Sequence, residues 1–351
     1  MPRSRRSLLE ATGLALGGGA LATLAGCTST SPTGGASSPA GSSPTDEPTP
    51  ADGTTESVSV DLAQWLPNPA SSPFRDGYSV RLFDIAAIRR HREAMHENAY
   101  RRLEREMLYP APDRYVDAAD IAASVGVGDA RVAIGSFDPD AIGERITSDG
   151  DSSTPTAERT PTTPTRTPWS EPEQYEGFDL YGTEYVYAVS EDVFMEVSPM
   201  RPESDGAGPY AKAIIDAGAG EAASYANGNA YVDAMLGTVD DPHALWCYPE
   251  AMDGSTTRGF RADEITGGLK SWRFGTETTH LTFANTYADA EAAEAEKLAS
   301  YIESESDRFG PYDGLDVEAS GRLVWTDGDI PTGEFDHLSA SGPEDGVTTP
   351  N

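Results

Sequence analysis

This sequence has very few lysines and cysteines. The chain of 351 residues holds three lysines and two cysteines, Cys27 and Cys247. Two cysteines cannot build a disulfide framework, so burial of apolar side chains must hold the fold. The formal net charge is −33. We therefore expect no nucleic-acid binding, which depends on neutralising phosphates with lysine and arginine.

Recognised catalytic patterns are also missing. There is no Gly-x-Ser-x-Gly elbow, and Gly218-Ala219-Gly220 lacks the further glycine and the lysine of a phosphate loop. His91 and His96 are five residues apart, whereas a zinc protease helix needs histidines four apart. The sequence therefore predicts no catalytic residue, no metal ligand and no cofactor.

Two further groupings have simpler interpretations than metal binding. His243 and Cys247 lie four apart on a predicted strand, which separates them by about 13 Å, too far to share one ion. Cys247 is better explained as a small buried hydrophobic residue beside Trp246. The pair Asp327 and Asp329 lacks most of a calcium loop and predicts a turn.

The N-terminus carries the most specific pattern. Arg5 and Arg6 precede an apolar run that is interrupted by three glycines and ends in Leu24-Ala25-Gly26-Cys27. The run is too short and too rich in glycine for a permanent membrane span. The paired arginines resemble a twin-arginine export signal, and the last four residues resemble a lipobox. The resemblance implies cleavage before Cys27, a membrane lipid on its sulfur, and a place at the extracytoplasmic face of the cell membrane.

The acidic, lysine-poor composition together with this leader resembles haloarchaeal exported lipoproteins of uncharacterised function. The resemblance covers the leader and the general character of the surface, and it brings no catalytic residues. So much like charge weakens a compact state at ordinary ionic strength. In molar salt the Debye length falls to about 3 Å, which removes most of this repulsion.

Composition divides the chain into segments. Residues 1–27 form the expected signal peptide, and the Ser/Thr/Pro-rich stretch 28–57 predicts a disordered tether. Residues 58–340 predict an α+β domain with a disordered insertion at 147–176, and 341–351 predict a disordered tail.

The first part of the domain predicts a strand near 78–82 and one long helix over 85–108. The outer face of this helix is rich in arginine and glutamate and is either a docking surface for an acidic partner or a solvated face. A short helix at 118–124 and a strand at 131–137 follow. Asp138 then predicts the N-cap of a helix that starts at 140.

The second part predicts more strands than helices. Strands are expected at 177–181, 185–189, 193–197, 243–248, 270–274, 279–285, 315–317 and 322–326, and helices at 210–217, 229–236 and 288–304.

Two stretches resemble each other by eye. A strand and a helix at 132–146 match those at 281–304, and Gly177-Phe178-Asp179-Leu180 matches Gly314-Leu315-Asp316-Val317. Two βαββ units would give antiparallel sheets with helices on one face, as in the ferredoxin-like plan. Coincidence remains the alternative explanation of so short a match.

These observations lead to a non-catalytic binding or structural module whose protein partner or small-molecule ligand is unknown. The alternative is a cell-surface hydrolase that uses acidic residues. Six aromatic residues on predicted strands either line a ligand groove or pack in the core: Tyr181, Tyr185, Tyr187, Trp246, Trp272 and Trp325.

Overall fold

The structure is a computed structural model. It describes residues 62–74, 77–108, 114–151, 171–182, 185–198, 206–249 and 265–335. The leader with Arg5, Arg6 and Cys27, the segment 28–57, residues 152–170 of the expected insertion and the tail 341–351 lie outside these residues.

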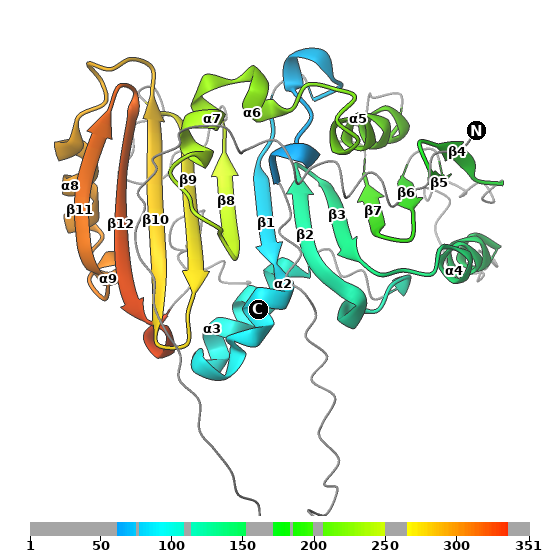
Figure 1. Cartoon of the computed structure of the whole chain (residues 1–351), viewed down its shortest axis with the longest axis horizontal. Coiled ribbons are helices and arrows are strands. Elements are labelled where there is room, and N and C mark those ends of the chain that lie inside the picture. The colour runs from blue at the N-terminus through cyan, green and yellow to red at the C-terminus, as the bar shows by residue number, and fades with distance from the viewer. Residues whose placement is uncertain are drawn as a thin grey trace, which may run out of the picture. The chain divides into compact units, whose positions relative to one another are not determined.

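One antiparallel sheet of twelve strands organises the described residues, in the order β11-β12-β10-β9-β8-β1-β2-β3-β7-β6-β5-β4 (Figure 1). The strands are β1 (Val80–Asp84), β2 (Ile121–Val127), β3 (Ala130–Gly135), β4 (Glu173–Tyr175), β5 (Phe178–Tyr181), β6 (Val186–Val189), β7 (Val193–Val197), β8 (Ala244–Tyr248), β9 (Ile265–Phe274), β10 (Thr278–Tyr287), β11 (Asp313–Ser320) and β12 (Leu323–Pro331). The α+β class expected from the sequence is confirmed.

The helices are short. They are α2 (Ile85–Arg90), α3 (Glu97–Met107), α4 (Pro139–Asp151), α5 (Gly208–Gly218), α6 (Tyr225–Gly228), α7 (Ala230–Leu236), α8 (Ala295–Ser304) and α9 (Ser306–Phe309). Single 3₁₀ turns lie at η1 (Leu62–Trp65), η2 (Pro69–Ser71), η3 (Arg92–Ala94), η5 (Ala118–Asp120) and η6 (Thr332–Glu334). In the described part of the chain, no helix is long and apolar enough to cross a bilayer.

Two hydrophobic cores cover the two faces of the sheet, because neighbouring strand residues point to opposite faces. Phe83 and Trp246 pack in a core that also contains side chains of α2, α3, α4, α8 and α9. Leu82 and Leu245 pack in a second core with side chains of α5, α6 and α7. The expectation of helices on one face was wrong, since both faces are covered.

The helix expected at 85–108 is in fact two helices. The carboxylate of Asp84 accepts a hydrogen bond from the backbone N–H of Ala87 at 2.7 Å and caps α2. That helix ends at Arg90, and Met95 is extended with φ −86° and ψ 150°. His96 then caps α3 by accepting a hydrogen bond from the N–H of Asn98 at 3.2 Å. The apolar spacing runs through this break, which is why the sequence pattern did not reveal it.

Two other boundaries differ from expectation. The stretch 118–124 is mostly strand, since β2 begins at Ile121 and alternates toward the two cores. The helix expected from 288 begins at Ala295, because Asp289 instead accepts hydrogen bonds from the N–H groups of Glu291 and Ala292 and closes a turn.

The predicted start of α4 is confirmed. The carboxylate of Asp138 accepts a hydrogen bond from the N–H of Ala141 at 3.1 Å, and the helix begins at Pro139. The helix runs on to Asp151, and β4 begins at Glu173. Both ends of the insertion expected at 147–176 are therefore regular structure.

The sheet has an internal symmetry about its central pair, β1 and β8. On one side of this pair the order is β2-β3-β7-β6, and on the other it is β9-β10-β12-β11. We call these sides, with β1 and β8 respectively, the first half and the second half. By sheet position β6 corresponds to β11, so the match of 177–180 with 314–317, which pairs β5 with β11, is one strand out of step.

The outer strands of the sheet carry exposed acids. β11 forms one edge and presents Asp313, Asp316 and Glu318 to solvent, and β4 forms the other edge and presents Glu173.

Candidate functional site

One row of directly paired residues crosses the sheet on the face that carries α3. Residues directly opposite one another in antiparallel strands share a face. The row runs Phe283, Lys270, Trp246, Arg81, Gly126, Arg131, Glu196 and Tyr187. Charged and small residues occupy its centre, whereas aromatic residues occupy its ends.

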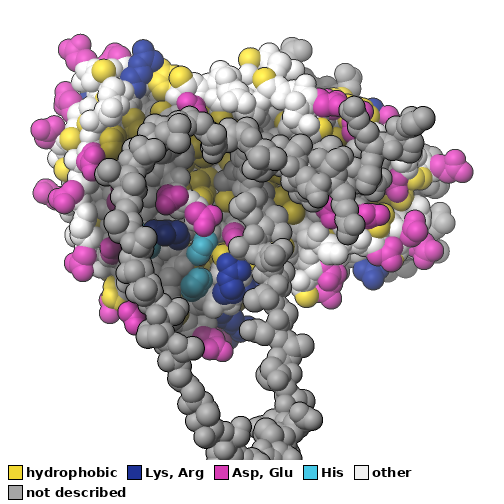
Figure 2. Space-filling model, in the orientation of Figure 1, with side chains coloured by type: hydrophobic (Ala, Val, Ile, Leu, Met, Phe, Trp, Pro, Cys, Tyr) yellow, Lys and Arg dark blue, Asp and Glu magenta, His cyan; other side chains and the backbone are white. Residues whose placement is uncertain are grey.

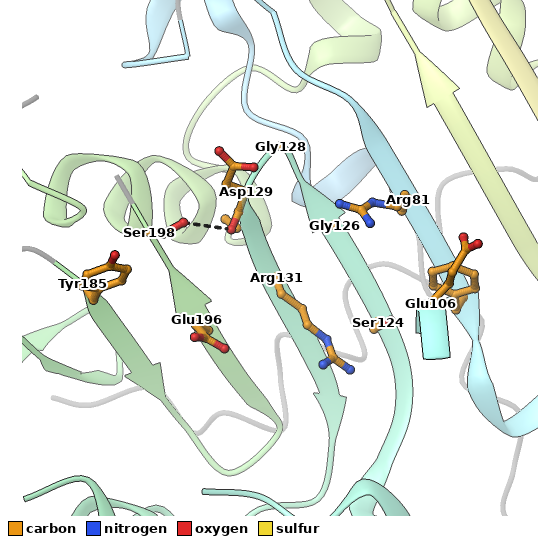
Figure 3. A pocket seen from close by; sticks show the side chains of 12 residues that line it. Arg81, Glu106, Ser124, Gly126, Gly128, Asp129, Arg131, Tyr185, Glu196 and Ser198 are labelled. Carbon is orange, nitrogen blue, oxygen red and sulfur yellow. Dashed lines mark hydrogen bonds between the residues drawn. The ribbon is translucent and has the colours of Figure 1, made fainter. Parts of the chain in front are cut away.

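A cavity of about 320 Å³ lies over the centre of this row, and we call it the sheet pocket. Its lining comes from β1, β2, β3 and β7 together with the residue before β6 and the end of α3. Figure 3 shows Arg81, Arg131 and Glu196 around this opening, with Tyr185 at one side.

Arg131 lines the pocket, but its side chain has a structural role. Its side chain is nearly buried, and its two terminal nitrogens donate hydrogen bonds to the carbonyls of Leu108 and Met107 at 3.0 and 3.1 Å. The hydroxyl of Ser124 donates a third hydrogen bond to the carbonyl of Met107 at 3.1 Å. These donors satisfy carbonyls at the C-terminus of α3, which carry partial negative charge.

Arg81 is differently placed. Its guanidinium makes no hydrogen bond or ion pair with the residues that the structure describes, and it lies beside Gly126 on the pocket side of β2 (Figure 3). A Cβ at position 126 would stand 3.3 Å from Cβ and 3.5 Å from Nε of Arg81. The glycine therefore gives the arginine room to lie over the neighbouring strand.

Glu196 and Tyr185 form the opposite side of the pocket. Burial raises the pKa of the Glu196 carboxyl, and the charge of Arg131 opposes that rise. Within the described ranges, Tyr185 is the one large hydrophobic side chain that is exposed, at 45%. Nearby, the hydroxyl of Ser198 donates a hydrogen bond to the carbonyl of Asp129 at 3.3 Å.

Lys270 is the other cation of the row, but it belongs to the core. The side chain is 5% exposed, and Nζ lies 5.0 and 5.4 Å from the ring centres of Trp246 and Trp272. Burial lowers the pKa of this amine to about 7, against a smaller opposing effect of Glu106. The two rings supply cation–π stabilisation for the charge that remains.

A second cavity, of about 580 Å³, lies between α4 and the turn η5. Three of its polar side chains bond to the local backbone. Asp117 and Asp138 cap η5 and α4, and Arg145 donates a hydrogen bond to the carbonyl of Tyr115 at 2.9 Å. We therefore take the sheet pocket, with Arg81 and Glu196 available, as the candidate site.

The aromatic residues singled out from the sequence have divided roles. Tyr181, Tyr187, Trp246 and Trp272 are buried, and Trp325 packs against the second core. Tyr185 alone among the six reaches the sheet pocket. Sequence reasoning missed Arg81 and Glu196, because only the register of four strands brings them together.

The histidines form a different pair from the one that the sequence suggested. His91 stacks on His243 with ring centres 5.7 Å apart, and Nδ1 of His243 accepts a hydrogen bond from the N–H of Phe274 at 3.1 Å. Burial lowers the pKa of both histidines. The described residues contain no group of three or more histidine, cysteine or acidic side chains placed to hold a metal.

Two smaller expectations have clear outcomes. Cys247 is buried, as predicted, and burial raises the pKa of its thiol to about 12. The turn expected at 327–329 was wrong, because Asp327 and Asp329 lie within β12 and accept hydrogen bonds from Thr282 and His280 of β10.

Charge is unevenly spread on the face shown in Figure 2. Acidic side chains are spread along the periphery of this face, and several lysine or arginine side chains lie with histidines near its centre, with acidic side chains among them. Cations are therefore concentrated locally in a chain of strongly negative net charge.

Comparisons with known proteins give no family. No family model matches the chain, and no curated protein matches it. Among solved structures, crystal form III of TP0453 aligns with a TM-score of 0.42 and 10% identity, over 78% of this chain and 95% of that chain. Crystal form I of TP0453 aligns with a TM-score of 0.42 and 11% identity, over 78% and 94%.

Proposed function

We propose that this protein is an exported lipoprotein of a halophilic cell, held by a lipid on Cys27 at the extracytoplasmic face of the membrane, and that its folded part binds a ligand without catalysis. The placement rests on the leader, in which Arg5 and Arg6 precede an apolar run that ends in Leu24-Ala25-Gly26-Cys27. Such patterns direct export and attach a lipid to the cysteine.

The sheet pocket is the observation that carries the binding role. Arg131 and Ser124 donate hydrogen bonds to carbonyls at the C-terminal end of α3. The side chains of Arg81 and Glu196 make no hydrogen bond with the described residues and line the cavity from opposite sides. A few polar groups that converge on a cavity are typical of a ligand site.

Mass spectrometry of the protein from native membranes tests the placement. We expect a mature N-terminus at Cys27 that carries a lipid, and we expect Cys27→Ser to move the protein into the soluble fraction. Cys247→Ser is the matched control and should leave it in the membrane, because Cys247 is buried in the sheet. An intact leader, or a bare thiol at Cys27 in a cytosolic fraction, contradicts the proposal.

A surface hydrolase is the second candidate, and one observation favours it. Burial raises the pKa of Glu196, as a general acid requires. Replacement by glutamine separates the two roles. Glu196→Gln should abolish turnover of any substrate that is hydrolysed, whereas a binding site should retain most of its affinity for a neutral ligand.

The halophilic part of the proposal has its own test. The net charge of −33 is tolerated where salt shortens the Debye length to about 3 Å. We expect the near-ultraviolet circular dichroism of the folded protein to be lost below roughly molar salt, as long-range repulsion returns. An unchanged spectrum in dilute buffer would contradict this expectation.

A further inference from the structure

The mixture of groups in the sheet pocket indicates the chemistry of its ligand. We propose that the pocket binds a hydroxyl-rich small molecule of the size of one or two sugar rings, stacked on Tyr185 and held by Arg81 and Glu196. This inference rests on the binding role proposed above and names the class of ligand.

The charge balance of the lining argues against a simple anion. The pocket is lined by two arginines, Arg81 and Arg131, and by three acids, Glu106, Asp129 and Glu196. A phosphate or a dicarboxylate would face more acids than arginines. A hydroxylated ligand avoids this repulsion, because each hydroxyl can donate a hydrogen bond to a carboxylate and accept one from a guanidinium.

Tyr185 supplies the apolar part of the recognition. Its ring is exposed at the side of a polar cavity. A ligand that covered the ring would remove apolar surface from water, which is favourable. The C–H face of a sugar ring is apolar and weakly positive, so it suits the negative face of an aromatic ring. A ligand that stacks there presents its hydroxyl edge to the sheet.

Arg81 and Glu196 are placed to bind that edge. Arg81 lies over Gly126 from one side, and Glu196 stands on β7, three strands from Arg81, with Arg131 between them. The guanidinium offers parallel donors to two neighbouring hydroxyls. The cavity of about 320 Å³ is at the small end of the range of about 300–1,000 Å³ usual for ligand pockets, which fits a small sugar.

The test is calorimetric titration of the full-length protein, purified from native membranes in detergent at high salt. The probes are the methyl glycosides of a neutral hexose, an N-acetylhexosamine and a hexuronate, with inorganic phosphate for comparison. We expect at least one glycoside to bind more tightly than phosphate. Tyr185→Ala should weaken it at least tenfold, Tyr185→Phe less than threefold, and Arg81→Met at least tenfold.

Tyr231→Ala is the matched control, because this tyrosine lies on α7, which packs on the other face. It should leave the affinity unchanged. Binding of phosphate alone would overturn the sugar class but leave a binding role, and an affinity indifferent to Tyr185→Ala would overturn the proposed site. If none of the glycosides or phosphate binds, the inference is overturned. Whether Cys27 carries a lipid in the same preparation tests the proposed membrane attachment separately.

Discussion

The two halves of the sheet share one strand order but fill the same face in different ways. In the second half the row continues through Lys270 and Phe283, and the ring of Phe283 lies 5.7 Å from that of Phe309 in α9. In the first half the corresponding stretch of the row is Arg81, Gly126 and Arg131 beneath a cavity. One half is thus closed by aromatic packing, and the other keeps a polar opening.

The difference shows how a single topology can separate stability from binding. Large aromatic side chains bury much apolar surface and dominate the energy of a core. A pocket needs polar groups that water or a ligand can satisfy, and such groups contribute little to folding. The residues of the pocket in the first half can then be replaced at little cost in stability, because the aromatic core of the second half stabilises the sheet.

The largest expected effect tests this division directly. Trp272→Ala removes a fully buried indole from the second half and should lower the free energy of unfolding by about 3–5 kcal/mol. Tyr185→Ala in the pocket should change it by less than about 0.5 kcal/mol. Denaturant titrations at fixed high salt measure both, and equal losses would remove the distinction between the halves.

The next effect concerns the structural cation of the pocket. Arg131→Met removes charged donors from two carbonyls at the end of α3 and should cost about 1.5–3 kcal/mol. Arg81→Met is the matched variant and should be nearly neutral in the same denaturant titration. A costly Arg81→Met would mean that this arginine holds the fold, so it would no longer be a free ligand group.

Lys270 gives the second half a characteristic dependence on pH. Its folded-state pKa is about 7, whereas an unfolded lysine keeps its proton up to about pH 10.4. Between these values the unfolded chain binds more protons, so stability should rise with pH, by up to about 1.4 kcal/mol per unit. Unfolding measured from pH 7 to 10 should show this slope in the wild type and in Lys212→Met, and lose it in Lys270→Met.

Glu196 should give the first half a smaller dependence of the opposite sign. Its folded-state pKa is raised by burial, so the folded chain binds more protons in the window above the ordinary glutamate value of about 4.3. Stability should therefore fall as pH rises through that window. Glu196→Gln should flatten this fall, whereas Glu173→Gln, at an exposed position on β4, should leave it in place.

Local patterns in the sequence predicted much of the fold. Alternating apolar residues located β6 and β7, and the strands expected at 270–274 and 279–285 lie within β9 and β10. The cap at Asp138 was found because an acid followed by proline is a local signal. Such features depend on neighbours in the chain, which a single sequence shows.

The rest depends on contacts between distant segments. A helix was expected over 118–124, but only Ala118–Asp120 form a 3₁₀ turn, because pairing of β2 with β1 and β3 makes the chain a strand from Ile121 on. The pocket needs the register that sets Arg81 opposite Gly126 and Trp246. No spacing within the sequence encodes that register, so Arg81 and Glu196 could not be distinguished from other charged residues.

The acids on the edge strand β11 affect whether separate copies of this chain can pair through that edge. β11 is eight residues long and leaves one row of backbone groups open, which is a template for a foreign strand. A second β11 docked there in antiparallel fashion, in the register that sets Asp313 opposite Glu318, would bring like charges face to face, which destabilises a pair of strands. The acids on β11 thus oppose the merging of sheets from separate molecules into fibres.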